Sequence, residues 1–161
     1  EIAQCLVGSE MCIRDRIYTD RDGEVIFKKY SPMGEMGAVS AELAEALART
    51  AGMSCAICDR DAVIAAAGGA KKDILERSIS SELEQLMERR ECYERGADEQ
   101  LEVLISSQDG CAVVAEAPII TDGDVSGCVA FVSEKEDEKA DEVLLKLCQS
   151  AAQFLSKRIA V

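Results

Sequence analysis

The segment that most constrains the fold is residues 17–32, IYTDRDGEVIFKKYSP, which has the pattern of a β-hairpin. Residues 17–19 favour a strand, Asp22-Gly23 is a strong two-residue turn signal, and residues 25–27 begin the return strand. A lone hairpin is only marginally stable in water, so this one requires strands from elsewhere. Because only a short segment precedes it, we expect the hairpin to be the end of a domain whose beginning is absent here.

Residues 1–16, EIAQCLVGSEMCIRDR, differ from the rest of the chain. They show no hydrophobic period and join the hairpin abruptly. The string CLVGSEMCIRDR looks like translated sequencing-adapter DNA, and we therefore expect that this segment is not native.

The composition excludes several classes of protein. The net charge of −13 makes the surface acidic, and an acidic surface repels the phosphate backbone of nucleic acids. No apolar run is long enough to cross a membrane, and no secretory signal is visible. We therefore predict a cytoplasmic protein with no membrane partner. With 161 residues and 48% apolar residues, the chain suits one domain with additional segments.

Eight cysteines raise the question of disulfides or metal. Without secretory features, we expect reduced thiols that pack as small hydrophobic side chains. Cys55 and Cys58 form a CxxC motif, but no second pair and no His accompany it. In a strand, these two side chains point to opposite faces, so we predict no metal site.

The absence of His removes the commonest general base, and with it any Cys–His or Ser–His pair. Asp59 and Asp61 flank a turn, where carboxylates usually cap backbone groups. The sequence therefore predicts no catalytic residues, no cofactor and no enzyme activity.

Helices and short strands are expected to alternate after Pro32. Apolar spacing predicts long helices at about 34–50 and 141–159 and shorter ones at 71–77 and 81–90, the last capped by Ser80. Strands are expected at 53–58, 63–67, 101–105, 111–120 and 125–132, with a loop at 91–99 and Pro118 at an edge, bulge or strand end. Because tight turns join successive strands, the predicted class is α+β, an antiparallel sheet flanked by helices.

Three separated motifs agree in order and spacing with those of a known family: ICDRD at 57–61, GGAKKDILERSIS at 68–80 and YTDRDGEVIFKKYSP at 18–32. Over residues 17–160 the chain resembles the stage V sporulation protein T family of transcriptional regulators. That family joins a swapped-hairpin DNA-binding domain of the AbrB type to a C-terminal GAF domain.

The resemblance implies that residues 17–32 are a remnant hairpin of the DNA-binding domain and that residues 33–161 form a GAF-like regulatory domain. It also implies flanking helices that associate between subunits, as a homodimer or tetramer. The alternative is that these helices only cover one face of the sheet. The basic DNA-contact segment of the family has no counterpart here. No DNA-binding residue is therefore assigned, and DNA binding is expected only of the intact protein.

A GAF domain implies a pocket for a small ligand. Its candidate lining is Cys58, Asp59, Gly68, Gly69, Lys71 and Lys72. Two glycines let a backbone approach closely, and the N-terminus of the helix that begins at Lys71 can receive an anion. The alternative is an ordinary loop with exposed lysines over an apolar core.

Three functions therefore fit the sequence. The favoured one is ligand sensing and oligomerisation within a sporulation transcription regulator. The others are a structural dimerisation module without a ligand, and an unrelated signalling domain of the GAF type.

Overall fold

Within the described residues of the computed structural model, five antiparallel strands form the central sheet, in the order β4-β3-β7-β6-β5. The structure describes residues 15–19, 25–29, 32–96, 111–135 and 140–160. In chain order the elements are β1 (Asp15–Thr19), β2 (Val25–Lys29), η1 (Pro32–Met36), α1 (Gly37–Ala51), β3 (Ser54–Cys58), β4 (Val63–Ala67), α2 (Lys71–Ile74), α3 (Ser81–Glu88), β5 (Tyr93–Glu94), β6 (Ala112–Thr121), β7 (Asp124–Ser133) and α4 (Glu142–Ile159). The predicted α+β class is confirmed.

The hairpin of β6 and β7 is the longest in the sheet, with ten residues in each strand. Thr121 pairs with Asp124, so the connection is the two residues Asp122 and Gly123. Both have positive φ angles, 53° and 88°. Such angles match the right-handed twist of paired strands, which explains why an Asp-Gly turn closes this hairpin.

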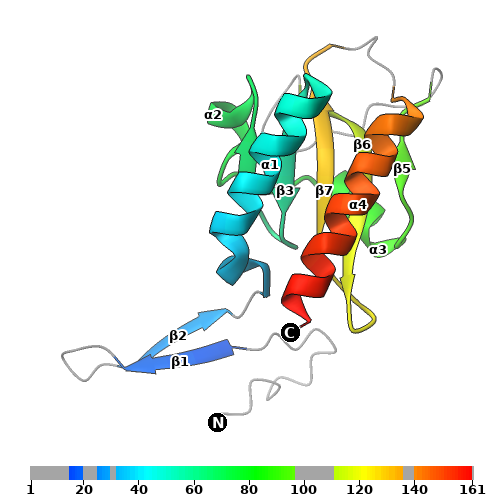
Figure 1. The fold of residues 1–161 in the computed structure, drawn as a ribbon. Helices are drawn as coiled ribbons and strands as arrows, with labels where there is room; N and C mark the ends of the chain where they lie inside the picture. The colour runs from blue at the N-terminus through cyan, green and yellow to red at the C-terminus, as the bar shows by residue number, and fades with distance from the viewer. Residues whose placement is uncertain (1–14, 20–24, 30–31, 97–110, 136–139, 161) are drawn as a thin grey trace.

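Helices cover both faces of the sheet. In Figure 1, α1 and α4 lie side by side across one face, where α1 packs on β3 and β4 and α4 on β6 and β7. The shorter helices α2 and α3 pack on the opposite face. Because neighbouring residues of a strand point to opposite faces, the sheet has two separate hydrophobic cores.

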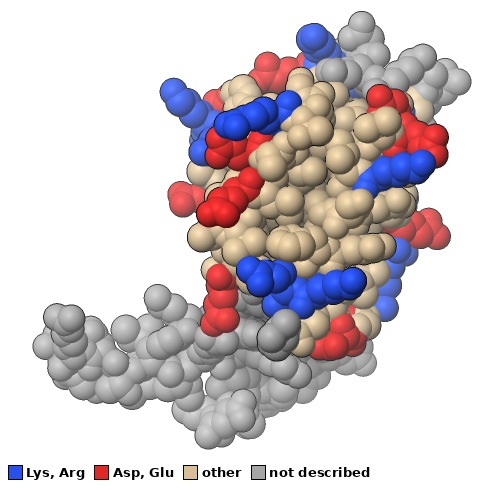
Figure 2. All heavy atoms as spheres, in the orientation of Figure 1, with Lys and Arg blue, Asp and Glu red and all other residues tan. Residues whose placement is uncertain are grey.

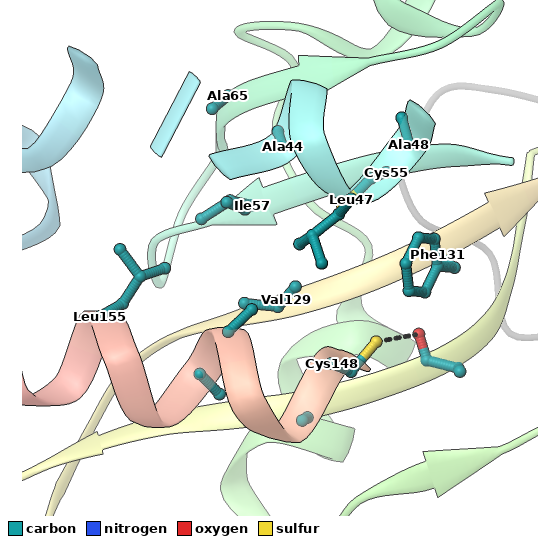
Figure 3. Close-up of a cluster of buried hydrophobic side chains, with 14 of the residues drawn as sticks. Ala44, Leu47, Ala48, Cys55, Ile57, Ala65, Val129, Phe131, Cys148 and Leu155 are labelled. Atoms are coloured by element: carbon teal, nitrogen blue, oxygen red, sulfur yellow. Dashed lines mark hydrogen bonds between the residues drawn. The ribbon is translucent and has the colours of Figure 1, made fainter. Parts of the chain in front are cut away.

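The core beneath α1 and α4 is built from a few large side chains and many small ones. Leu47 of α1 lies near Phe131 of β7, and Leu155 of α4 lies farther along the same core, beyond Val129 (Figure 3). The small residues let the helices approach the sheet closely; they include Ala44, Ala48, Ala151 and Ala152. The Sγ of Cys148 donates to the carbonyl oxygen of Ala115 at 3.8 Å. This core needs few aromatic residues, consistent with an aromatic content of 4%.

Side-chain oxygen atoms accept hydrogen bonds from the backbone at the start of α3 and of α4. The hydroxyl of Ser80 accepts from the N–H of Leu83 at 3.0 Å, which confirms the predicted cap of α3. Asp141 accepts from the N–H of Leu144 at 2.8 Å at the start of α4. Each cap satisfies an N–H group that has no partner within its own helix.

The predicted hairpin is confirmed by β1 and β2, which pair with each other as a separate two-stranded sheet (Figure 1). Strand β1 begins at Asp15, two residues earlier than predicted and inside the segment expected to be non-native. The expected turn at Asp22-Gly23 lies outside the described residues. The division of the chain at residues 16 and 32 stays a prediction.

Two local predictions were wrong. The helix expected over residues 71–77 ends at Ile74, because Glu76 and Arg77 bond instead to the backbone of Val63. The loop expected over residues 91–99 contains strand β5, whose two residues pair with β6. The strand expected over residues 101–105 lies outside the described residues.

Pro118 lies in β6 beyond the point where β5 ends, since β5 pairs only with Ala115 and Glu116. The proline therefore occupies an edge position, where its missing N–H breaks no bond to β5. This confirms the predicted placement.

Candidate ligand site

The sheet face beneath α2 and α3 carries small side chains and one buried carboxyl group. Ala56, Ala130 and Glu116 are aligned in register across β3, β7 and β6, and Tyr93 of β5 lies opposite Glu116. Residues opposite each other on antiparallel strands share a face. Ala56 and Ala130 belong to the core under α2 and α3, so Glu116 points toward that core.

Glu116 is fully buried, with 0% of its surface exposed. Among the described residues, neither of its carboxyl oxygens has a hydrogen-bond partner. Burial without a partner disfavours the charged form, and it raises the pKa of Glu116 from the ordinary value of 4.5 to about 8. At neutral pH the group is therefore mainly a protonated carboxyl.

Two buried thiols lie beside this carboxyl on the same face. Cys58 and Cys128 are directly opposite each other on β3 and β7, and both are free cysteines. Their mutual hydrogen bond, together with burial, raises the pKa of the Cys128 thiol, and the neighbouring Glu116 adds to this shift. Cys128 is therefore a poor nucleophile, because the thiolate is the reactive form.

The CxxC motif is split between the two cores. Cys55 lies in the core under α1 and α4, whereas Cys58 lies in the core under α2 and α3. The prediction that they face opposite sides of a strand is confirmed. Within the described ranges, no three His, Cys, Asp or Glu residues are grouped as metal ligands.

The six residues predicted to line a pocket are not brought together. Cys58 and Asp59 lie at one end of β3, whereas Gly68 and Gly69 lie beside its other end, because Cys58 pairs with Val63 and Cys55 with Ala67. At about 3.3 Å per residue, the two groups are separated by roughly 13 Å along the strand.

The carboxylate of Asp59 stabilises the turn between β3 and β4. Its Oδ1 accepts from the N–H groups of Asp61 at 2.7 Å and Ala62 at 2.8 Å. This is the capping arrangement that the sequence favoured for this carboxylate.

The backbone of Gly68 lies close to Ser54 of the same chain. It has a φ of +98°, and a β-carbon there would lie 2.7 Å from the Cα of Ser54. Lys71 and Lys72 are exposed and begin α2, which has only four residues. A helix of about one turn has a small dipole, so it offers little attraction to an anion. The role of these residues in ligand binding stays a prediction.

An open depression of about 390 Å³ lies beside the C-terminal end of α1. Of the predicted residues it contains only Gly68 and Gly69, and the exposed ion pair of Glu45 and Arg49, 2.8 Å apart, lies in its wall. Its full lining is Glu45, Ala48, Arg49, Gly52, Met53, Ser54, Ala67, Gly68 and Gly69. The charges of that pair already neutralise each other, so the depression offers little specific chemistry.

Sequence reasoning missed Glu116 and the buried Arg95. A signal for Glu116 was present, since it is the one charged residue in the ten-residue strand AVVAEAPIIT. Arg95 has no comparable signal. It is buried, its backbone N–H donates to the carbonyl oxygen of Val114 at 2.9 Å, and its side chain donates to the carbonyl oxygen of Lys135 at 3.3 Å.

Comparison with known proteins decides the family. Residues 35–160 match the family model described as "Stage V sporulation protein T C-terminal, transcription factor". The chain belongs to the stage V sporulation protein T family. It is also similar to stage V sporulation protein T of Bacillus subtilis (strain 168), with 38% identity over 143 residues, covering 89% of this chain and 79% of that protein. Membership confirms the predicted resemblance and decides against an unrelated signalling domain.

Solved structures confirm the GAF fold expected for a stage V sporulation protein T family member. The GAF domain of the Acinetobacter phosphoenolpyruvate-protein phosphotransferase has a TM-score of 0.61 and 13% identity, covering 83% of this chain and 84% of that one. The GAF domain of the Coxiella burnetii enzyme has a TM-score of 0.61 and 18% identity, over 78% and 82%. The cofactor-binding GAF domain of the nutrient sensor CodY from Clostridium difficile has a TM-score of 0.53 and 14% identity, over 74% and 83%. At these identities the likeness concerns the fold alone.

No helix in the described part of the chain is long and apolar enough to cross a membrane.

Proposed function

We propose that residues 33–161 form the regulatory domain of a sporulation transcription factor, which self-associates through α1 and α4 and senses a small ligand. The observation that carries the proposal is the match of residues 35–160 to a transcription-factor domain of the stage V sporulation protein T family. Regulation rather than catalysis is the proposed role. DNA binding belongs to the intact protein, and the proposed location is the cytoplasm.

An apolar strip on α4 supports self-association. Val143 is 62% exposed and Phe154 is 45% exposed. They are about three helical turns apart, so they lie on one line along the helix, with the half-buried Leu147 between them. Large apolar side chains that remain exposed along one line are typical of a surface that packs against another protein.

The neighbouring helix α1 also carries apolar side chains that are only partly buried. Val39 and Leu43 of α1 are partly buried against the core that α1 shares with α4. Figure 2 shows this face of the molecule, with a central uncharged area and most of the charged side chains toward its margins. An uncharged centre with a charged rim is the usual composition of an interface between subunits. A second copy of the same helix pair is the occupant that we propose.

Sedimentation velocity of the full chain tests this self-association. We expect dimers or tetramers for the wild type and mainly monomers for the double variant Val143→Glu/Phe154→Glu, because buried carboxylates oppose association. Gln85→Glu, an exposed change on α3, is the control and should sediment as the wild type does. An unchanged sedimentation coefficient for the double variant would contradict the proposal.

A structural dimerisation module without a ligand is the second candidate. It is favoured by Leu83, Leu86 and Met87 of α3, which are almost fully buried and fill the space against the second sheet face. Thermal-shift measurements with a broad panel of metabolites and nucleotides separate the two candidates. A saturable rise in melting temperature supports sensing, whereas no rise with any compound supports the structural module.

A further inference from the structure

We propose that Glu116 is the anchor of the sensing site and that it binds a small organic cation, with an ammonium or amidinium group on a short apolar body. This inference rests on the ligand-sensing function proposed above. It adds the anchoring residue and the chemical class of the ligand.

The first support is that the carboxyl group is buried without a partner. Glu116 is 0% exposed, and neither carboxyl oxygen has a hydrogen-bond partner among the described residues. Buried polar groups are nearly always hydrogen-bonded, so an exception requires an explanation. A ligand that donates N–H groups to both oxygens would supply the missing bonds.

The second support is the surface that surrounds the carboxyl. The neighbouring positions on β3 and β7 carry the small side chains of Ala56, Ala130, Cys58 and Cys128. The opposing helices contribute apolar side chains, among them Ile74, Leu83 and Leu86. A carboxyl group whose neighbours are mostly small or apolar suits a ligand with one polar end and a short apolar body.

The described protein groups near Glu116 do not supply the hydrogen bonds that its carboxyl oxygens lack. Tyr93 lies opposite it on β5, and the thiols of Cys58 and Cys128 lie diagonally across β7 and β3. Cys148 of α4 lies near enough for Glu116 to raise its pKa, although it packs on the other face. Arg95 follows β5 and donates from Nη1 to the carbonyl oxygen of Lys135. The charged residues of α2 and α3 are exposed.

The negative charge of an ionised carboxylate, and of the protein as a whole, favours a cationic ligand over an anionic one. An ionised carboxylate only accepts hydrogen bonds, so it pairs best with a group that carries several N–H donors. The net charge of −13 also attracts cations to the molecule and repels anions. Because Glu116 is fully covered, entry of the ligand requires the covering side chains to move aside.

A proton must leave when the cation binds. Burial raises the pKa of Glu116 to about 8, so the free protein holds the proton at neutral pH. The cation favours the ionised form, and the carboxyl proton therefore passes to solvent on binding. Affinity should rise with pH up to about 8, by as much as tenfold per unit.

Isothermal titration calorimetry of the full chain with 3-methylbutylamine, benzylamine and agmatine tests the proposal, with 3-methylbutanoate and benzoate as anionic counterparts. We expect at least one amine to bind and neither carboxylate to bind. Affinity should be about tenfold to 100-fold lower at pH 6 than at pH 8. Below pH 8, titrations in phosphate and Tris buffers should show the release of nearly one proton for each ligand bound.

Glu116→Gln is the decisive variant, because it keeps the shape of the side chain and removes its ionisation. It should bind the amine at least tenfold more weakly and release no proton. Glu94→Gln, which changes an exposed carboxylate on the neighbouring strand, should bind as the wild type does. Carbon-13 NMR titration of the Glu116 carboxyl in the wild type gives an independent readout, a fall in its pKa when the amine is present.

Three outcomes would overturn the proposal. Equal binding of amines by the wild type and Glu116→Gln would show that this residue is not the anchor. Binding of the carboxylates instead of the amines would show that the ligand class is wrong. Lack of binding by all three amines would also show that the proposed ligand class is wrong. In each case, a metabolite that raises the melting temperature would leave the sensing function itself intact.

Discussion

Gly127 of β7 passes so close to Cys58 that a β-carbon at position 127 would lie 2.0 Å from the carbonyl oxygen of Cys58. The Cα of Asp59 would lie 3.1 Å from the same β-carbon. The contact is with backbone atoms, so no side chain can rotate away. Only glycine allows β3 and β7 to remain paired at this point.

Gly127→Ala should therefore destabilise the protein by about 2–4 kcal/mol, since the two strands must separate or distort to accept the methyl group. Urea denaturation followed by circular dichroism measures the change. Gly37→Ala is the matched control, because a β-carbon there meets no atom within 4 Å and the residue begins a helix. The control should be neutral or slightly stabilising. Equal midpoints for Gly127→Ala and the wild type would contradict the close contact.

Glu116 should make stability fall as the pH rises. Its pKa is 4.5 when unfolded and about 8 when folded, so between these values the folded state holds a proton that the unfolded state has lost. The favourable contribution is complete below pH 4.5 and is lost by about pH 8, at about 1.4 kcal/mol per pH unit.

Urea denaturation of the wild type and of Glu116→Gln between pH 5 and pH 8 tests this expectation. The variant lacks the titrating group, so its free energy of unfolding should increase relative to that of the wild type as the pH rises. The exposed change Glu94→Gln controls for the loss of one negative charge. Parallel stability curves for the wild type and Glu116→Gln would show that the pKa of this carboxyl is not raised.

The two helix caps should each contribute measurably to stability. Ser80→Ala and Asp141→Ala remove the acceptors for the N–H groups of Leu83 and Leu144. Each change should cost about 1 kcal/mol, within the usual range of 0.5–2 kcal/mol for a lost cap. Ser81→Ala, at the exposed position next to Ser80, should have a much smaller effect in the same denaturation measurement.

Thiol reactivity should separate Cys92 from the other described cysteines. Cys92 is exposed, whereas Cys55, Cys58, Cys111, Cys128 and Cys148 are buried. Burial also raises the pKa of several of them, including Cys55 and Cys148, which lowers their thiolate fraction. Iodoacetamide labelling of the native protein, read by peptide mass spectrometry, should modify Cys92 first. Labelling of Cys58 or Cys128 at the rate of Cys92 would show that the second core opens readily.

Much of the fold could be predicted because its signals are local. Strand β4 has the predicted bounds, and α4 follows the predicted apolar spacing to within one residue. The Ser80 cap was equally readable, since a cap depends on residues three positions apart. The predicted pocket lining combined residues from both ends of β3, a separation that no local signal shows, and its role in ligand binding stays a prediction.

The sequence by itself determined the helices, the strands, the tight turns and the family, because hydrophobic period, caps and turn residues act over a few positions. Only the tertiary structure decided that α2 ends at Ile74 and that Tyr93 begins a strand, because both depend on bonds to distant segments. The tertiary structure also decided the burial of Glu116. A charged residue in an apolar strand is exposed or buried according to which strands and helices pack around it, and that arrangement is not local to the strand.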